Sequence, residues 1–152
     1  MGKIYTAIGL MSGTSLDGVD LSIIRSDGNK EISSILDRYF EYDKELIQKI
    51  LNIREKITNS EGLNKHSDEI KDVEREITLF HVKAIKEILE KSKFSVDLIG
   101  FHGQTIFHNP EKKITKQLGD GKLLSQLTKK KVICNFRQND LENGGQGAPL
   151  TP

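Results

Sequence analysis

An apolar stripe of helical period in the middle of the chain constrains the fold more than any other feature. The apolar positions recur at spacings of three or four, at Ile70, Val73, Ile77, Phe80, Ala84 and Ile88. This period predicts a helix of about six turns, with charges of both signs on its solvated faces. Ser67, followed by Asp68 and Glu69, is a favourable start for that helix. A helix this long must bury its stripe against another layer of secondary structure.

Strand-like runs precede this helix. They span residues 4–10, 19–25 and 32–42 and are separated by turn-forming residues, including the Asp27-Gly28 pair. Asp43 is a suitable cap for a first helix, which should end at the break around residues 59–62. The first third of the chain therefore predicts an antiparallel meander of three strands that leads into helices.

Strand character returns after the long helix. Residues 96–101 are expected to form a strand that ends at residues 102–105, and residues 132–134 form a second one. A turn at residues 118–121 and a short helix at residues 122–128 lie between them. The predicted fold class is thus α/β, a mixed sheet of about five strands with helices packed on it. In such open sheets, ligands bind where strands end.

Composition narrows the classes of partner and the cellular compartment that we expect for this chain. Lys and Arg number 23 against 22 Asp and Glu, so a net charge of +1 offers no general attraction to nucleic acid or an anionic membrane. Residues 111–131 hold seven Lys against two acids, yet they lack the interleaved aromatics of a nucleic-acid motif. We expect no nucleic-acid partner. The sequence shows neither a bilayer-length apolar run nor a secretory signal, and it has one cysteine, so we expect a cytoplasmic protein without membrane contact.

A first candidate site follows the first predicted strand. Its residues are Gly13, Thr14, Ser15, Leu16, Asp17, Gly18, Val19 and Asp20. A phosphate needs N–H donors, hydroxyls and little bulk. Gly13 and Gly18 allow backbone approach and positive φ, and Thr14 and Ser15 add hydroxyl donors. Asp17 and Asp20 would repel a bare phosphate but would suit a hydrated Mg²⁺ between carboxylate and phosphate. The alternative is an ordinary hairpin rich in Asx turns.

Two further clusters follow later strands. His102 and Gln104 could hydrogen-bond a sugar, and the alternative is a histidine satisfied by the backbone. Arg137 offers bidentate donors to an anion and Asp140 an acceptor for sugar hydroxyls. The alternatives here are a local ion pair between Arg137 and Asp140 and a tight turn in the glycine run at residues 144–147.

These three clusters together resemble a known family. The segments are GLMSGTSLDGVD at residues 9–20, GFHGQT at residues 100–105 and FRQNDLENGGQGAPLTP at residues 136–152. In order and spacing they are similar to the signature segments of the anhydro-N-acetylmuramic acid kinase family. The resemblance runs along the whole chain, although the charged helical middle is not diagnostic.

The resemblance implies a ribonuclease-H-like domain of the actin and hexokinase ATPase superfamily, in which two such halves hold ATP in a cleft. It implies a kinase that adds water across 1,6-anhydro-N-acetylmuramic acid, opens the anhydro bridge and phosphorylates O6 with ATP and Mg²⁺. The product is N-acetylmuramic acid 6-phosphate, an intermediate of cell-wall recycling. The expected partners are therefore a small amino sugar and ATP.

Carried over by position, residues 13–20 would form the phosphate-binding turn, with Asp17 and Asp20 in the Mg²⁺ shell. His102, Gln104, Arg137 and Asp140 would line the sugar side. Two departures affect that side. The family usually has Asp where this chain has Asn135, and its Arg-rich stretch is replaced here by Gln138 and Asn139.

Length is the larger departure. Family members are roughly twice as long as this chain, so residues 1–152 are expected to be the single N-terminal half of a two-domain sugar kinase. The water-activating aspartate of the family, in an Asp-x-Gly-Pro-Gly-Asn segment, would lie beyond Pro152, so the catalytic residue is unknown and the chain alone should be nearly inactive. The alternative is a truncated, non-catalytic binding module. Either a homodimer or association with the missing C-terminal half would cover an exposed apolar patch.

Overall fold

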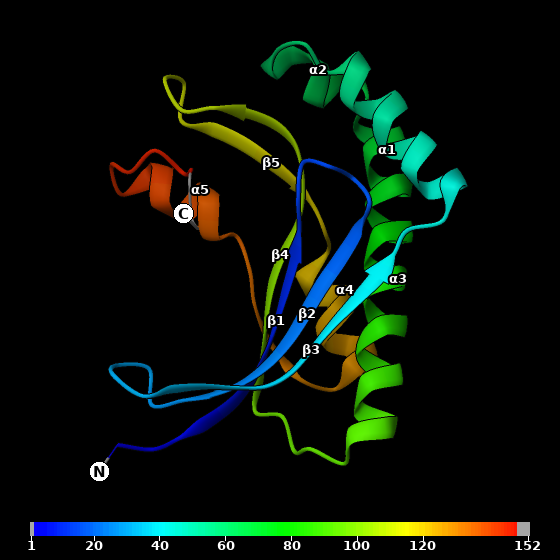
Figure 1. Cartoon of the computed structure of the whole chain (residues 1–152). Coiled ribbons are helices and arrows are strands. Elements are labelled where there is room, and N and C mark those ends of the chain that lie inside the picture. Colours follow the sequence, from blue (N-terminus) through cyan, green and yellow to red (C-terminus); the bar gives the residue numbers. More distant parts are fainter. Residues whose placement is uncertain (1, 149–152) are drawn as a thin grey trace.

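The structure is a computed structural model that describes residues 2–148 (Figure 1). Eleven elements follow one another: β1 (Tyr5–Ser12), β2 (Gly18–Ser26), β3 (Ile32–Glu41), α1 (Lys44–Lys56), α2 (Ser60–Lys65), α3 (Ser67–Ser92), β4 (Leu98–Asn109), β5 (Ile114–Leu118), α4 (Gly121–Thr128), β6 (Lys131–Ile133) and α5 (Phe136–Glu142). The predicted α/β fold class is confirmed.

The six strands form one mixed sheet in the order β3-β2-β1-β4-β5, with β6 also paired to β4. The first three strands are the predicted antiparallel meander. β4 then runs parallel to both β1 and β6 and antiparallel to β5. The end of β1 therefore lies beside the middle of β4, where Ser12 pairs with Gln104 and Gln104 pairs with Leu118 of β5.

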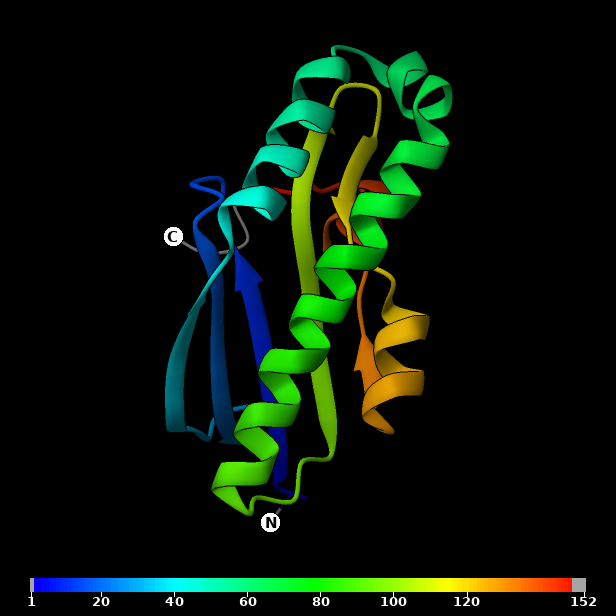
Figure 2. The same ribbon diagram turned by 90° about the vertical axis from the view of Figure 1, so that its right-hand side faces the viewer.

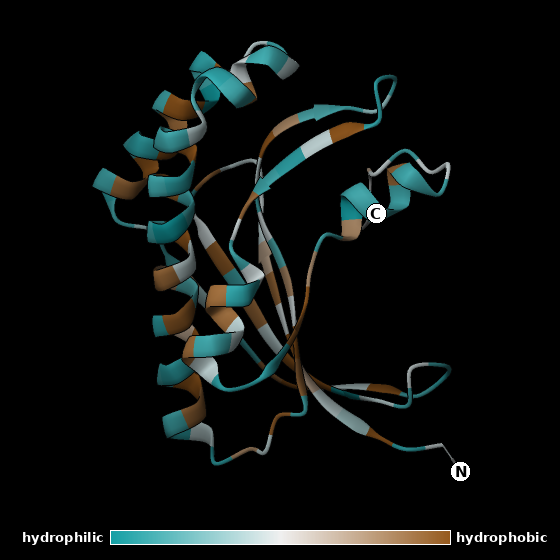
Figure 3. Cartoon of the chain, turned by 180° about the vertical axis from the view of Figure 1, so that it is seen from behind, coloured by the Kyte–Doolittle hydropathy of each residue, from teal (hydrophilic) through white to brown (hydrophobic). Residues whose placement is uncertain are grey.

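Helices α1, α3 and α4 cover one face of this sheet (Figure 2). The strands alternate, so that Ile8, Leu21 and Ile99 point into the core, whereas α3 supplies its predicted stripe through Ile77 and Ile85. Figure 3 shows α3 alternating between hydrophobic and hydrophilic along its whole length, as an amphipathic helix should. Within residues 2–148, no helix has the length and apolar character needed to cross a membrane.

Local signals explain the helix starts. Asp43 caps α1 as predicted, because its Oδ1 accepts a hydrogen bond from the Leu46 amide at 2.8 Å. α3 begins at Ser67 as predicted, but its cap residue is His66, which makes no side-chain cap bond. The first helix ends at Lys56, before the expected break, but residues 60–62 are themselves helical, because Asn59 caps the short helix α2 by accepting from the Gly62 amide at 3.0 Å.

The second strand-rich region, residues 98–133, differs most from the expected secondary structure. β4 does not end at residue 101 but continues to Asn109, through Gly103 with φ +77°. A side chain at Gly103 would collide with the carbonyl of Leu118, so only glycine lets β5 pair there. β5 itself and α5 were not predicted. Both follow left-handed residues, Lys113 (φ 54°) and Asn135 (φ 63°), whose turns carry no glycine or proline signal at that position.

Candidate functional site

The loop between β1 and β2 is anchored by one buried side chain and by two backbone hydrogen bonds. Leu16 has φ 58° and is 2% exposed, so its side chain anchors the loop in the core. Its amide donates to the Gly13 carbonyl at 3.3 Å, and the Tyr42 amide donates to the Asp17 carbonyl at 2.9 Å. Of the predicted site residues, Gly13 to Asp17 lie in this loop, whereas Gly18, Val19 and Asp20 begin β2. Val19 is buried in the core, so its side chain does not face a ligand.

The two glycines of the loop differ in what they do. A side chain at Gly18 would collide with the Phe40 carbonyl and the Tyr39 ring on the neighbouring strand, so the fold requires glycine there. A Cβ at Gly13 would meet nothing closer than Ser15 Oγ at 3.6 Å, an ordinary contact. Neither glycine uses the positive φ that glycine allows, and Leu16 takes the left-handed conformation in this loop. Glycine at position 13 serves no packing need and leaves the backbone open.

Two backbone amides of this loop are left unpaired by the described part of the chain. Within the described residues, the backbone amides of Thr14 and Ser15 have no hydrogen-bond partner. Arg54 of α1 reaches the same place, with Nη1 3.5 Å from the Thr14 carbonyl. The sequence analysis missed Arg54, because in a charged amphipathic helix nothing distinguishes one cation from its neighbours. Amides, hydroxyls and a guanidinium in one place favour an anion.

A buried hydrogen-bond network supports the loop from below. Gln104 Nε2 donates to the Gly13 carbonyl at 2.9 Å, and Ser12 Oγ lies 2.9 Å from the Tyr42 hydroxyl. His81 of α3 completes it, with Nε2 3.4 Å from Ser12 Oγ and Nδ1 2.7 Å from the Ile77 carbonyl. A carbonyl only accepts, so Nδ1 carries the proton and Nε2 accepts from Ser12.

Burial sets the charge state of that network. Desolvation lowers the pKa of His81 to about 4 and raises the pKa of Tyr42 to about 12, so both are neutral near pH 7. His81 is fully buried, and the sequence analysis did not single it out. The available signal was its position in the apolar repeat of α3, between Ile77 and Ile85, where an ordinary surface histidine would not fall.

Two exposed carboxylates, Asp17 and Asp20, flank the start of β2. Ser15 Oγ donates to Asp17 Oδ1 at 2.5 Å, and this bond, followed by nearby backbone amides, lowers the pKa of Asp17. Asp20 projects from β2 and is exposed. Desolvation and then the charges of Asp17, Glu41 and Asp20 raise the pKa of Tyr39, which stands opposite Asp20 on the neighbouring strand β3. Residues 2–148 contain no cluster of three or more His, Cys, Asp or Glu that could hold a metal ion alone.

The predicted sugar-side residues form a second region, where β4 meets α5. Arg137 Nε donates to His102 Nε2 at 2.6 Å, and Arg137 Nη1 donates to the Gly147 carbonyl at 2.8 Å. His102 Nδ1 lies 2.7 Å from the Gly103 carbonyl, which fixes the proton on Nδ1. Burial, opposed by this backbone bond, lowers the pKa of His102, and burial also lowers that of Arg137. His102 is therefore a neutral acceptor for Arg137.

Asp140 is engaged by the chain that follows α5. Its Oδ2 accepts from the Gly147 amide at 2.8 Å, and its carbonyl accepts from the Gly145 amide at 2.8 Å. A side chain at Gly145 would collide with the Asp140 carboxylate. The expected alternative, an ion pair between Arg137 and Asp140, is not among the ion pairs of residues 2–148. Arg137 and Asp140 instead both bond to Gly147, Arg137 at its carbonyl and Asp140 at its amide.

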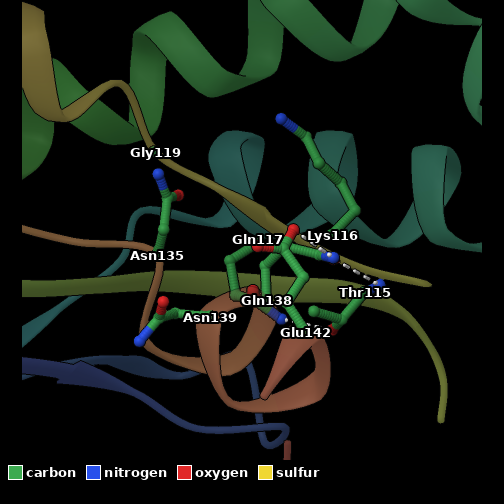
Figure 4. A pocket seen from close by; sticks show the side chains of 8 residues that line it. All are labelled: Thr115, Lys116, Gln117, Gly119, Asn135, Gln138, Asn139 and Glu142. Atoms are coloured by element: carbon green, nitrogen blue, oxygen red, sulfur yellow. Dashed lines mark hydrogen bonds between the residues drawn. The ribbon is translucent and has the colours of Figure 1, made fainter. Parts of the chain in front are cut away.

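A polar cavity of about 410 Å³ lies between β5 and α5 (Figure 4). It is lined by Thr115, Lys116, Gln117, Gly119, Asn135, Gln138, Asn139 and Glu142. Asn135, Gln138 and Asn139, the positions at which we expect a departure from the family pattern, all line this cavity. Lys116 is paired with Glu74 at 2.8 Å, and the amides of Gln117 and Gln138 already hydrogen-bond within the chain.

The two regions lie close together. Gln104 pairs with Ser12 on one side and with Leu118, next to Gly119, on the other. Two strand spacings, about 10 Å, therefore separate the open loop from the near wall of the amide cavity.

A sequence model of the anhydro-N-acetylmuramic acid kinases matches residues 5–152. The chain belongs to this family. It is 58% identical to an anhydro-N-acetylmuramic acid kinase of Pelagibacter ubique over 152 residues, all of this chain and 40% of the relative. It is 42% identical over 158 residues to such a kinase of Agrobacterium fabrum, covering all of this chain and 42% of that relative. For that of Gluconobacter oxydans the identity is 44% over 147 residues, or 96% of this chain and 40% of the relative.

The chain therefore spans about 40% of the length of the curated relatives it matches. The mixed α/β fold is that expected for the actin and hexokinase ATPase superfamily, to which the resemblance pointed. Family membership confirms the resemblance carried by the three segments, including residues 9–20 and 136–152.

Proposed function

We propose that this chain is the nucleotide-phosphate half of an ATP-dependent kinase acting on 1,6-anhydro-N-acetylmuramic acid. The reaction adds water, opens the anhydro bridge and transfers the γ-phosphoryl group to O6, giving N-acetylmuramic acid 6-phosphate and ADP. Membership of a family whose relatives are named as this kinase supports the reaction. The main structural support is the open backbone of the loop at Gly13, with free amides at Thr14 and Ser15.

In this proposal the phosphates of ATP lie on the outer side of the β1–β2 loop. The Thr14 and Ser15 amides donate to phosphate oxygens, and Arg54 offsets part of the negative charge. Gln104, Ser12 and the neutral His81 hold the loop in shape from beneath, without competing for the ligand.

Asp17 and Asp20 fit a Mg²⁺ ion bound together with ATP. Mg²⁺ usually keeps several waters and takes one or two carboxylates plus phosphate oxygens, so a full protein cage is not needed. Asp17 is ionised and exposed, and Asp20, three residues later, is exposed as well. The ion would neutralise the charge that develops on the transferred phosphoryl group.

The sugar is proposed to lie along α5. His102, Gln104, Arg137 and Asp140 give this side its shape, since their hydrogen bonds tie β4, α5 and the glycine turn together. The amides of the cavity, above all Gln138 and Asn139, would meet the hydroxyl and acetamido groups of a sugar.

The water-activating base is proposed to come from the part of the family's length that this chain does not span. On its own the chain would then bind Mg·ATP without turnover. A non-catalytic binding module of the same fold is the second candidate, and the same open loop would serve it.

A chimera separates the two candidates. Residues 1–152 replace the matched segment of the Pelagibacter ubique relative, and formation of ADP and N-acetylmuramic acid 6-phosphate is measured. We expect turnover by the chimera, none by the chain alone, and loss of at least about 100-fold in the chimera with Asp17→Asn. Asp27→Asn is the matched control, because Asp27 is also an exposed loop carboxylate but lies at the far end of β2. A folded chimera without turnover would favour the binding module.

A further inference from the structure

Tyr42 lies where the chain passes from β3 into α1, between Glu41, the last residue of β3, and Asp43, the cap of α1. Gly18 at the start of β2 pairs with Glu41, so the register of this hairpin places Tyr42 beside Asp17 of the β1–β2 loop. Figure 2 shows the passage from β3 to α1 next to that loop. Tyr42 is only 2% exposed, although it directly follows a strand at the edge of the sheet.

Tyr42 bonds to both ends of the β1–β2 loop. Its hydroxyl lies 2.9 Å from Ser12 Oγ, where the loop leaves β1, and its backbone amide donates to the Asp17 carbonyl at 2.9 Å, where the loop enters β2. The amides of Thr14 and Ser15, unpaired within residues 2–148, lie between these two points in sequence. The bond to Asp17 uses only its carbonyl, so it does not compete with the Mg²⁺ ion proposed for its carboxylate.

The hydroxyl of Tyr42 acts as the donor to Ser12. His81 Nδ1 faces the Ile77 carbonyl at 2.7 Å, so Nδ1 carries the proton and Nε2 accepts from Ser12 Oγ at 3.4 Å. A serine hydroxyl has one proton, and because Ser12 donates it to His81, its oxygen accepts from Tyr42. Ser12 is 2% exposed and has no proton left for a ligand, so its side chain acts on the loop and not on a substrate.

Packing fixes the ring of Tyr42 as well as its hydroxyl. The ring meets that of Phe80 on α3 edge to face, with centroids 4.8 Å apart and an interplanar angle of 64°. Phe80 precedes His81 on the same helix, so α3 holds both the ring and the far end of the chain of hydrogen bonds. Gln104 of β4 donates to the Gly13 carbonyl at 2.9 Å. The start of the loop is therefore fixed both from the helix layer and from the sheet.

We propose that Tyr42 is a positioning residue for the phosphate groups of ATP. By holding Ser12 and Asp17 at a fixed separation, it keeps the amides of Thr14 and Ser15 in one arrangement before ATP binds. A preorganised loop binds more tightly, because less conformational freedom is lost on binding. Tyr42 touches neither ATP nor sugar and acts only through the loop. The inference rests on the proposed function, which assigns the phosphates to this loop.

Tyr42→Phe removes the hydroxyl but keeps the ring packing on Phe80 and the backbone bond to Asp17. The dissociation constant of the chain for Mg·ATP, measured by calorimetric titration, should rise about tenfold, while the melting temperature falls by only about 2–4 °C. In the chimera with the Pelagibacter ubique relative, the KM for ATP should rise about tenfold, with kcat and the KM for the sugar nearly unchanged. Tyr5→Phe, at the opposite end of β1, is the matched control and should change none of these quantities.

A double variant tests whether the hydroxyl of Tyr42 acts through Ser12. Ser12→Ala removes the same hydrogen bond, so Tyr42→Phe added to Ser12→Ala should weaken Mg·ATP binding no further than Ser12→Ala alone. Additive losses would show that the hydroxyl acts elsewhere and would overturn the proposal. An unchanged dissociation constant in folded Tyr42→Phe would overturn it as well.

Hydrogen exchange in the ligand-free chain separates this inference from the proposed function. Tyr42→Phe should raise the exchange rates of the Leu16 amide and of the amide at position 42 by about fivefold or more, because both bonds close the loop, whereas Tyr5→Phe should not. Failure of the unchanged chain to bind Mg·ATP would overturn the proposed function and the ligand named here. Normal binding by the unchanged chain, with neither exchange nor affinity altered in Tyr42→Phe, would overturn the positioning role alone.

Discussion

The β1–β2 loop and the α5 region both carry polar side chains at the ends of strands, but they use them in opposite ways. Around the loop, the support is buried and internal, while the amides of Thr14 and Ser15 have no hydrogen-bond partner within residues 2–148. Around α5, the side chains that seemed best suited to a ligand, His102 and Arg137, bond to each other. A residue type therefore indicates chemistry, but free hydrogen-bonding capacity decides whether a group can bind.

The largest expected effect separates architecture from binding within the loop. Gly18→Ala should destabilise the chain by about 3 kcal/mol or more, because the new Cβ would collide with the Phe40 carbonyl and the Tyr39 ring. Gly13→Ala should leave stability within about 0.5 kcal/mol and instead weaken binding of Mg·ATP, since it covers an open backbone. Urea unfolding and calorimetric titration measure the two quantities. Equal losses of stability would remove the distinction between the glycines.

Acid should weaken the buried hydrogen-bond network of Ser12, Tyr42 and His81 that supports the β1–β2 loop. The pKa of His81 is about 4 in the folded chain against a usual value of 6.5, so the unfolded state binds more protons between these values. Stability from this group is complete above about pH 6.5 and is lost as the pH falls towards 4, by on the order of 3 kcal/mol.

Denaturant unfolding from pH 7.5 to pH 4 measures that loss in the chain and in His81→Gln. The variant should show a lower stability at pH 7.5 but a flatter decline, since its amide does not titrate. His66→Gln is the control, because His66 lies at the α2–α3 junction and is not part of the buried network. The same decline in His81→Gln as in the unchanged chain would assign the acid sensitivity to other groups.

The next effect tests the α5 region. Arg137→Ala should cost about 2 kcal/mol, because it removes charged hydrogen bonds to His102 and to the Gly147 carbonyl and leaves the His102 Nε2 without its donor. Hydrogen exchange should rise in residues 143–147 and change little in the β1–β2 loop. Arg25→Ala, an exposed arginine on β2, is the control. Unchanged exchange around Gly147 would show that Arg137 is not needed to hold the turn.

The sequence predicted an element correctly wherever its pattern was compatible with only one kind of structure. The repeat from Ile70 to Ile88 could bury its apolar side only as a long helix, and Asp43 before an apolar periodic run was a recognisable cap. β5 and α5 were missed because a left-handed Lys113 and Asn135 create their turns, and propensity does not favour that conformation for lysine. Which polar groups stay free could not be predicted either, since Gln104 meets Gly13 and Arg137 meets His102 only through the register of β4.

Substitution of Gln138 in the amide cavity should have the smallest effect on stability. It tests most directly whether the α5 region binds a ligand as the β1–β2 loop is proposed to do. Gln138 makes exposed or half-buried bonds to the Thr115 amide, the Lys113 carbonyl and Glu142 Oε1, at 3.3, 3.2 and 3.0 Å. Gln138→Ala should therefore cost no more than about 0.5 kcal/mol.

If the cavity holds the sugar, the KM of the Gln138→Ala chimera for 1,6-anhydro-N-acetylmuramic acid should rise about tenfold, while its KM for ATP is unchanged. Gln48→Ala on α1 removes a comparable exposed amide bond, to Asn52, and should change neither. An unchanged KM for the sugar in Gln138→Ala would place the sugar elsewhere and leave the amides of α5, like His102 and Arg137, as groups that the fold itself uses.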